Sequence, residues 1–66
     1  MDDFEKARIR MEHWIHHNEH HQEEYELFAD QLEDAGKKET ARHIREMIEY
    51  TAKTNEALRK ALASLA

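Results

Sequence analysis

The 66-residue sequence contains no cysteine, no proline and a single glycine, Gly36. Without cysteine the chain forms no disulfide, no zinc–thiolate site and no iron–sulfur cluster, and it has no cysteine nucleophile. Without proline, and with glycine only at position 36, no residue before that point breaks a helix. Long helices are therefore the expected structure.

Long apolar runs are also missing. No stretch approaches the ~18 consecutive apolar residues of a membrane helix, and the first five residues lack the basic start of a signal peptide. Apolar residues make up 39% of the chain and charged residues 38%, a balance typical of amphipathic helices. We expect a soluble, cytoplasmic protein that spans no membrane.

Negative charge is concentrated in the first half of the chain. Residues 1–35 carry eleven acidic and three basic side chains, whereas residues 36–66 carry four acidic and seven basic ones. No basic face is accompanied by aromatic side chains that stack on bases, so we expect no nucleic-acid partner. The opposite charges of the halves favour packing of one against the other, although each exposed ion pair contributes only ~0–1 kcal/mol.

Apolar residues recur at alternating steps of three and four, the spacing of helices that pack along one stripe. Asp2 with Glu5 fits a capping box, and Gly36 fits the left-handed position that ends a helix. The predicted core of the first helix is Phe4, Ala7, Met11, Trp14, Asn18, His21, Tyr25, Phe28, Leu32 and Ala35. That of the second helix is Ala41, Ile44, Ile48, Thr51, Asn55, Leu58, Leu62 and Leu65.

These patterns predict one all-α domain, residues 1–66, folded as an antiparallel two-helix hairpin. The first helix is expected at about 3–35, the turn at 36–37 and the second helix at about 38–65. Such a hairpin leaves flanking residues such as Ile9, Ile15, Leu27 and Met47 partly exposed. We therefore expect a homodimer in which two hairpins form a four-helix bundle.

Five of the six histidines fall within nine residues: His13, His16, His17, His20 and His21. Residues four apart lie one turn apart on the same helix face, where two imidazoles can bind one ion. The row of His13, His17 and His21 therefore predicts a metal site, whereas the row of His16 and His20 points toward solvent. The flanking carboxylate of Glu24 is a further possible donor.

A polar layer is predicted at the level of this cluster. In a hairpin that turns near residues 36–37, the numbers of facing residues add up to roughly 73, which places Asn18 opposite Asn55 and His21 opposite Thr51. The ligand set expected for a divalent transition metal, nickel or zinc, is thus His17 and His21, assisted by His13, Asn18 or Asn55. The asparagines are alternatively the partners that orient the imidazoles, or a layer that fixes register without any ligand.

The pattern His-Trp-x-x-His-Asn-x-x-His, on His13, Trp14, His17, Asn18 and His21, resembles a family of small uncharacterised helical-hairpin domains. The similarity covers about residues 10–65. These domains occur alone or after a nickel-binding accessory domain linked to carbon monoxide dehydrogenase maturation. The resemblance implies a metal-related role and raises nickel relative to zinc.

Two classes of function follow. The first is a metal-binding module that stores, delivers or senses a divalent transition metal and has a metal-delivery partner protein. In a dimer whose midpoints are aligned, His17 and His21 of both chains would share one site or form two nearby sites. The second class is a purely structural or partner-binding bundle whose His/Asn layer sets register and oligomer state. No enzymatic activity is expected, because a hairpin without pocket-forming loops has little to hold a substrate.

Overall fold

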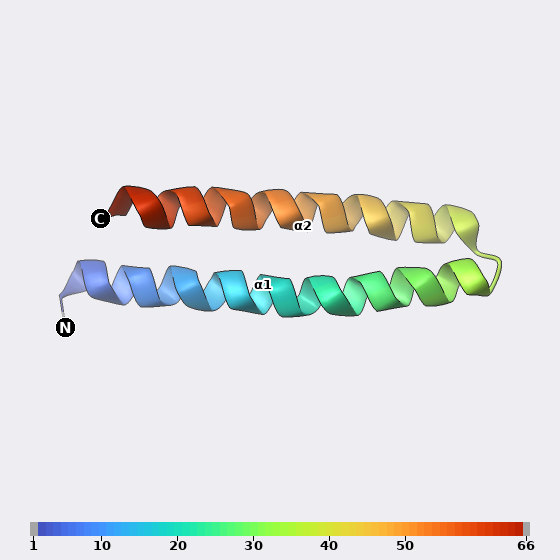
Figure 1. Ribbon diagram of the computed structural model, residues 1–66, viewed down its shortest axis with the longest axis horizontal. Coiled ribbons are helices and arrows are strands. Elements are labelled where there is room, and N and C mark those ends of the chain that lie inside the picture. Colours follow the sequence, from blue (N-terminus) through green and yellow to red (C-terminus); the bar gives the residue numbers. More distant parts are fainter. Residues whose placement is uncertain (1, 66) are drawn as a thin grey trace.

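The computed structural model describes residues 2–65 and contains two helices, α1 (Asp3–Asp34) and α2 (Lys38–Leu65). They lie side by side and antiparallel in a hairpin 51 Å long, with both chain ends at the same end (Figure 1). The predicted all-α hairpin is confirmed. Met1 and Ala66, the ends of the predicted domain, lie outside the described residues. Within residues 2–65, neither helix has an apolar stretch sufficient to cross a membrane.

Capping interactions define both ends of α1. The Asp2 side chain accepts a 2.7 Å hydrogen bond from the backbone N–H of Glu5, as the sequence predicts for the N-cap. At the other end Gly36 has φ of 83°, and the N–H groups of Gly36 and Lys37 donate to the carbonyl oxygens of Glu33 and Leu32. This pair of bonds is a Schellman motif, which satisfies the last carbonyls of α1 and reverses the chain within three residues.

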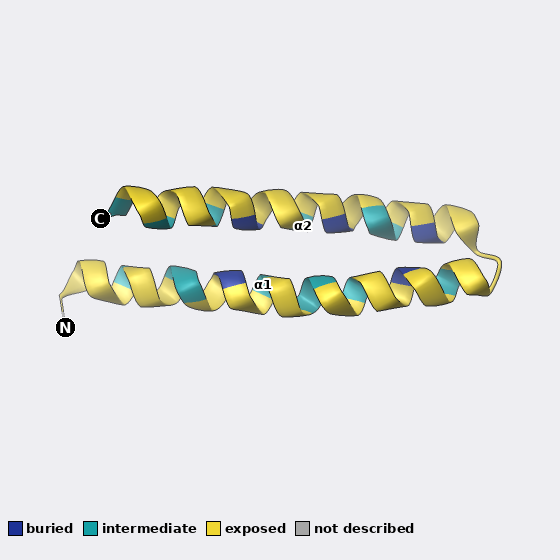
Figure 2. Ribbon diagram, in the orientation of Figure 1, coloured by how far each residue is buried: buried dark blue, intermediate teal, exposed yellow. Residues whose placement is uncertain are grey.

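Burial is confined to the sides on which the two helices face each other (Figure 2). On α2 every predicted core position, from Ala41 to Leu65, is buried or half-buried. Within residues 2–65 the buried apolar side chains are Ile15, Ala29, Ala41 and Ile48. The core is therefore one narrow layer between two helices.

On α1 the predicted core stripe is only half correct. Six predicted core residues of α1 are half-buried as predicted: Ala7, Met11, Asn18, His21, Tyr25 and Leu32. At two other positions burial is displaced by one residue, so that Ile15 and Ala29 are buried in place of Trp14 and Phe28, and Gln22 is half-buried beside His21. Trp14 is 47% and Phe28 50% exposed, whereas Ile15 is 6% exposed. The stripe that faces α2 is thus rotated by ~45° from the predicted one.

Close approach of the helices explains this displacement. Ala29 and Ala41 are both fully buried, with no exposed surface. Two alanines allow the helix backbones to approach closely, since interhelical distance depends on the side chains at the contact. An indole or phenyl ring in that position would force the helices apart. Phe4, at 72% exposed, and Ala35 lie outside the core for a different reason, because they stand at the ends of α1 where the interhelical layer stops.

Candidate metal centre

The histidine row lies on one flank of α1, beside the helix–helix seam. His13, His17 and His21 follow one another at intervals of four residues within the uninterrupted helix Asp3–Asp34. His13 and His17 are exposed, and His21 is half-buried. Since the fully buried residues of α1 lie on the other side of its contact with α2, the row borders the interhelical seam, with His21 as its half-buried member.

His17 and His21 bring two ring nitrogens together. Their Nε2 atoms are 2.8 Å apart, with one ring donating and the other accepting according to tautomer, and their ring planes are nearly perpendicular at 89°. Two imidazoles bound to one ion at ~2.0–2.1 Å have nitrogens ~3.0–3.4 Å apart, depending on the ligand angle. A small opening of this contact therefore creates space for a metal ligated by both nitrogens.

Glu24 borders the outer nitrogen of the same pair. Its Oε2 lies 3.7 Å from Nδ1 of His21, and its Oε1 lies 3.0 Å from Nε2 of His20. A carboxylate near Nδ1 favours the tautomer that carries its proton there, which leaves Nε2 of His21 available as a metal ligand. Glu24 is thus placed to orient an imidazole.

His13 extends the row without joining the pair. Its ring stacks on that of His17, with centroids 5.9 Å apart and planes inclined by 22°. In the part of the chain that the structure describes, no three histidine, aspartate or glutamate side chains converge on a common point. A single chain therefore presents a converging pair of ligands.

The other histidines point to solvent and contact local carboxylates. His16 lies 3.4 Å from Glu19 with its side chain 82% exposed, and His20 is 70% exposed. Their outward positions agree with the helical angles of the sequence. His43, on α2, lies 3.8 Å from both Glu39 and Glu46, well away from the cluster along the hairpin.

Asn18 and Asn55 bind each other across the seam. Nδ2 of Asn18 donates to Oδ1 of Asn55 at 2.9 Å, and Nδ2 of Asn55 donates to the carbonyl oxygen of Ile15 at 3.1 Å. Asn55 is only 2% exposed. Because a carbonyl oxygen can only accept, the amide NH₂ group of Asn55 faces Ile15 and its oxygen is left to face Asn18. The predicted facing of the two asparagines is confirmed, and both are occupied in a structural hydrogen-bond network.

The rotation of α1 changes the rest of the polar layer. With Asn18 facing Asn55, the residue opposite Thr51 is Gln22, which is half-buried. His21 is half-buried as well, at the edge of the seam, and its predicted opposition to Thr51 stays a prediction. The hydroxyl of Thr51 bonds within its own helix, donating to the carbonyl of Met47 at 3.1 Å.

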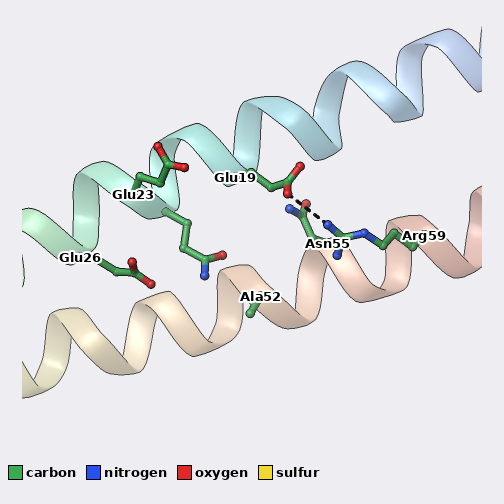
Figure 3. A pocket seen from close by; sticks show the side chains of 7 residues that line it. Glu19, Glu23, Glu26, Ala52, Asn55 and Arg59 are labelled. Carbon is green, nitrogen blue, oxygen red and sulfur yellow. Dashed lines mark ion pairs between the residues drawn. The ribbon is translucent and has the colours of Figure 1, made fainter.

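A polar groove on the other side of the seam was not predicted. Its volume is about 280 Å³, and Figure 3 shows its lining side chains, with an ion pair of 3.4 Å between Arg59 and Glu19. The lining residues are Glu19, Gln22, Glu23, Glu26, Ala52, Asn55 and Arg59. Ala52 is the only signal for it in the sequence, since a small residue beside the seam leaves space there.

Further toward the turn, Arg45 of α2 bonds to Glu33 and Asp30 of α1, and these bonds raise the pKa of Arg45.

Neither curated proteins nor solved structures match this chain. A family model described as a domain of unknown function, DUF8180, matches residues 7–65, which include both helices, the histidine row and the asparagine pair. The chain therefore belongs to the family of this domain, DUF8180.

Proposed function

We propose that this protein is a small metal-binding module that holds a divalent transition metal through Nε2 of His17 and Nε2 of His21. The observation that supports the proposal is the 2.8 Å approach of these two nitrogens on consecutive turns of α1. Such a module stores, delivers or senses its ion. The helical hairpin supplies rigidity to the ligand pair, because both histidines lie in the middle of a continuous helix.

Nickel and zinc fit this donor set. Imidazole nitrogen is a good ligand for both ions, and the chain offers no thiolate that would favour copper(I) or an iron–sulfur cluster. Nickel is the first ion to test, since the His-Trp-x-x-His-Asn-x-x-His stretch resembles domains associated with a nickel-binding accessory of carbon monoxide dehydrogenase. In that context the module would exchange its ion with a metal-delivery partner protein.

We assign different roles to the remaining residues of the predicted ligand set. Asn18 and Asn55 hold the register of the hairpin, because their amide groups bond to each other and to the Ile15 carbonyl. His13 is the nearest additional imidazole, and a rotation of its side chain would bring it toward the ion. The metal site thus depends on helix α1, and α2 supports it from behind.

We further propose that the protein is a homodimer that forms a four-helix bundle. Four buried apolar side chains are a small core for residues 2–65, and several large apolar side chains are half exposed. Small domains without disulfides or metals are marginally stable, and association of two copies is a common solution. Pairing by a two-fold axis would cover the exposed side chains of both copies.

Calorimetric titration of metal-free protein with Ni²⁺ and Zn²⁺ tests the metal-binding proposal. We expect a dissociation constant below about 100 μM, equivalent to more than ~5.5 kcal/mol of binding free energy, for at least one ion. The variant His17→Ala/His21→Ala should lose this binding. The matched control, His16→Ala/His20→Ala, removes two exposed imidazoles at the same spacing and should retain it. Absence of binding by the unaltered protein, or equal binding by both double variants, would refute the proposal.

The second candidate function is a purely structural or partner-binding bundle. It is favoured by the Asn18–Asn55 bond, because buried asparagine pairs fix register and oligomer state in helical bundles with no ligand at all. This alternative predicts a stable assembly whose properties do not change with added metal. The titration above separates the two candidates.

A further inference from the structure

The histidine pair lies on the same side of the hairpin as some of its large exposed apolar residues, Trp14, Phe28, Met47 and Tyr50. Trp14 and Phe28 flank the pair along α1 at 47% and 50% exposed, and Met47 of α2 is 36% exposed. At 100° per residue, Trp14, His17, His21 and Phe28 occupy one flank of α1. The interhelical ion pairs of Arg45 and Arg59 lie on the opposite flank. The hairpin thus has a charged side and a histidine–aromatic side, and we call the second the histidine face.

The ligand count indicates how a metal site on this face is completed. Zinc and related ions in closed protein sites take four protein ligands. One chain brings together a pair, His17 and His21, and residues 2–65 contain no converging group of three candidate ligands. In a two-fold dimer the same patch of both copies meets, so every ligand is doubled. Two copies therefore supply four imidazoles.

We propose that a second copy of this chain packs on the histidine face, and that His17 and His21 with the partner's His17 and His21 form one four-imidazole site on the two-fold axis. The inference rests on the proposed metal binding. It adds the position of the ion, between two chains, and the partner that covers the histidine face, a second copy of this chain. The exposed rings of Trp14 and Phe28 then become buried on either side of the ion, which excludes water from it.

The charges of α1 favour an antiparallel contact between the two copies of this helix. Residues 3–18 carry three acidic and three basic side chains, whereas residues 19–34 carry seven acidic and no basic ones. Antiparallel pairing about residue 19 lays the neutral half of one helix against the acidic half of the other. Parallel pairing would bring fourteen carboxylates together. The antiparallel arrangement also places His17 opposite the partner's His21, as the shared site requires.

The second helices and the size of the face are compatible with this arrangement. In the register set by Asn18 and Asn55, Thr54 of α2 lies at the level of residue 19 of α1. The two-fold axis of the proposed dimer therefore passes a small side chain on α2. The same axis places Tyr50 opposite the partner's Leu58. Tyr50 is 61% exposed in the single chain. The hairpin is 51 Å long and 16 Å wide between Cα atoms, so its broad face extends along the whole length of both helices.

Two adjacent residues provide a matched pair of variants for the interface. Phe28 lies on the histidine face, and Leu27 points away from the seam on the outer side of the same helix; they are 50% and 61% exposed. Both Phe28→Glu and Leu27→Glu replace an exposed apolar side chain by a carboxylate. Circular dichroism checks that both variants stay helical.

Sedimentation equilibrium with and without Ni²⁺ or Zn²⁺, combined with metal content per chain, tests the proposal. We expect one ion per two chains and a dimer dissociation constant at least about 10-fold lower with saturating metal, because an ion bound only by the dimer stabilises it. Phe28→Glu should weaken the dimer at least about 10-fold, and Leu27→Glu should leave it unchanged. His17→Ala/His21→Ala should remove the effect of metal.

The possible contrary results are distinguishable. One ion per chain with an unchanged dimerisation constant would overturn the shared site and leave the proposed metal binding intact. Metal binding by a protein that remains a monomer would have the same meaning. Equal effects of Phe28→Glu and Leu27→Glu would overturn the assignment of the face. If neither ion binds at all, the proposed function itself fails and the shared site fails with it.

Discussion

Asn18 donates a 2.9 Å hydrogen bond to Asn55 from a position 37 residues away in the chain. This bond joins the middle of α1 to α2, and together with the bond from Asn55 to the Ile15 carbonyl it forms a polar contact in the seam. Because each helix face repeats every three or four residues, sliding one helix by a turn would preserve apolar contacts but separate the two amides. The asparagine pair therefore selects one register among several of similar apolar burial.

Removal of one asparagine should destabilise the hairpin. Asn55→Ala removes a side chain that is 2% exposed and leaves the Asn18 amide without its partner across the seam. A lost partner of this kind costs about 1–3 kcal/mol. Urea denaturation at fixed protein concentration measures the loss, with Glu56→Ala as an exposed control on the same helix. A loss no larger than that of the control would contradict the structural role of the pair.

Replacement of both asparagines should have a different outcome. Asn18→Leu/Asn55→Leu leaves no unpartnered amide in the seam and adds apolar contact, so we expect equal or greater stability together with loss of a unique register. Broadened amide resonances in the nuclear magnetic resonance spectrum would report the second effect. A variant that keeps sharp, single resonances would show that the apolar residues alone determine register.

The displaced stripe of α1 can be tested with two neighbouring residues. Ile15→Ala removes a side chain that is 6% exposed and should cost about 2–5 kcal/mol. Trp14→Ala removes a larger side chain that is 47% exposed, and it should cost less than Ile15→Ala in the isolated chain. Thermal unfolding at protein concentrations below the dimer dissociation constant makes this comparison. If Trp14→Ala lowered stability more than Ile15→Ala, the core positions predicted for α1 from the sequence would be the correct ones.

The turn should tolerate little change at Gly36. Its φ of 83° lies in the left-handed region, and a Cβ built there meets no atom within 4 Å. Gly36→Ala therefore produces backbone strain without a clash, at a cost of about 1–2 kcal/mol. Gly36→Asn should lose less, since asparagine tolerates this conformation better. The melting temperatures of the two variants measure this difference. Equal melting temperatures would show that backbone strain at position 36 is not the cause of the lost stability.

Metal should stabilise the fold to an extent set by its affinity. A ligand bound only by the folded state adds ~2.7 kcal/mol when its free concentration is 100 times the dissociation constant. For a chain of this size that corresponds to a rise of roughly 10–20 °C in melting temperature. Thermal unfolding of metal-free protein with increasing Ni²⁺ measures the rise. His17→Ala/His21→Ala should show none, and a rise of the same size in that variant would place the ion elsewhere.

The amino-acid sequence by itself determined the two helices, the turn and the core face of α2. Helix α2 has its large aliphatic residues on one face, so its core positions had no competitor. The spacing of the histidines also determined which rings are neighbours along α1, since that depends only on helix geometry. The pairing of Asn18 with Asn55 followed from the position of Gly36, because the site of a tight turn sets the register of a hairpin.

Only the tertiary structure decided which side of α1 faces its partner. Apolar residues occur around much of α1. Trp14 and Ile15 are adjacent alternatives for one level of the core, and Phe28 and Ala29 are adjacent alternatives for another. The choice went to Ile15 and Ala29 because close helix approach at Ala29 and Ala41 leaves no room for a ring, and because the Ile15 carbonyl accepts a bond from Asn55. That rotation left His21 half-buried at the edge of the seam. Burial depends on what the opposite helix can accommodate, and periodicity within one helix does not contain that information.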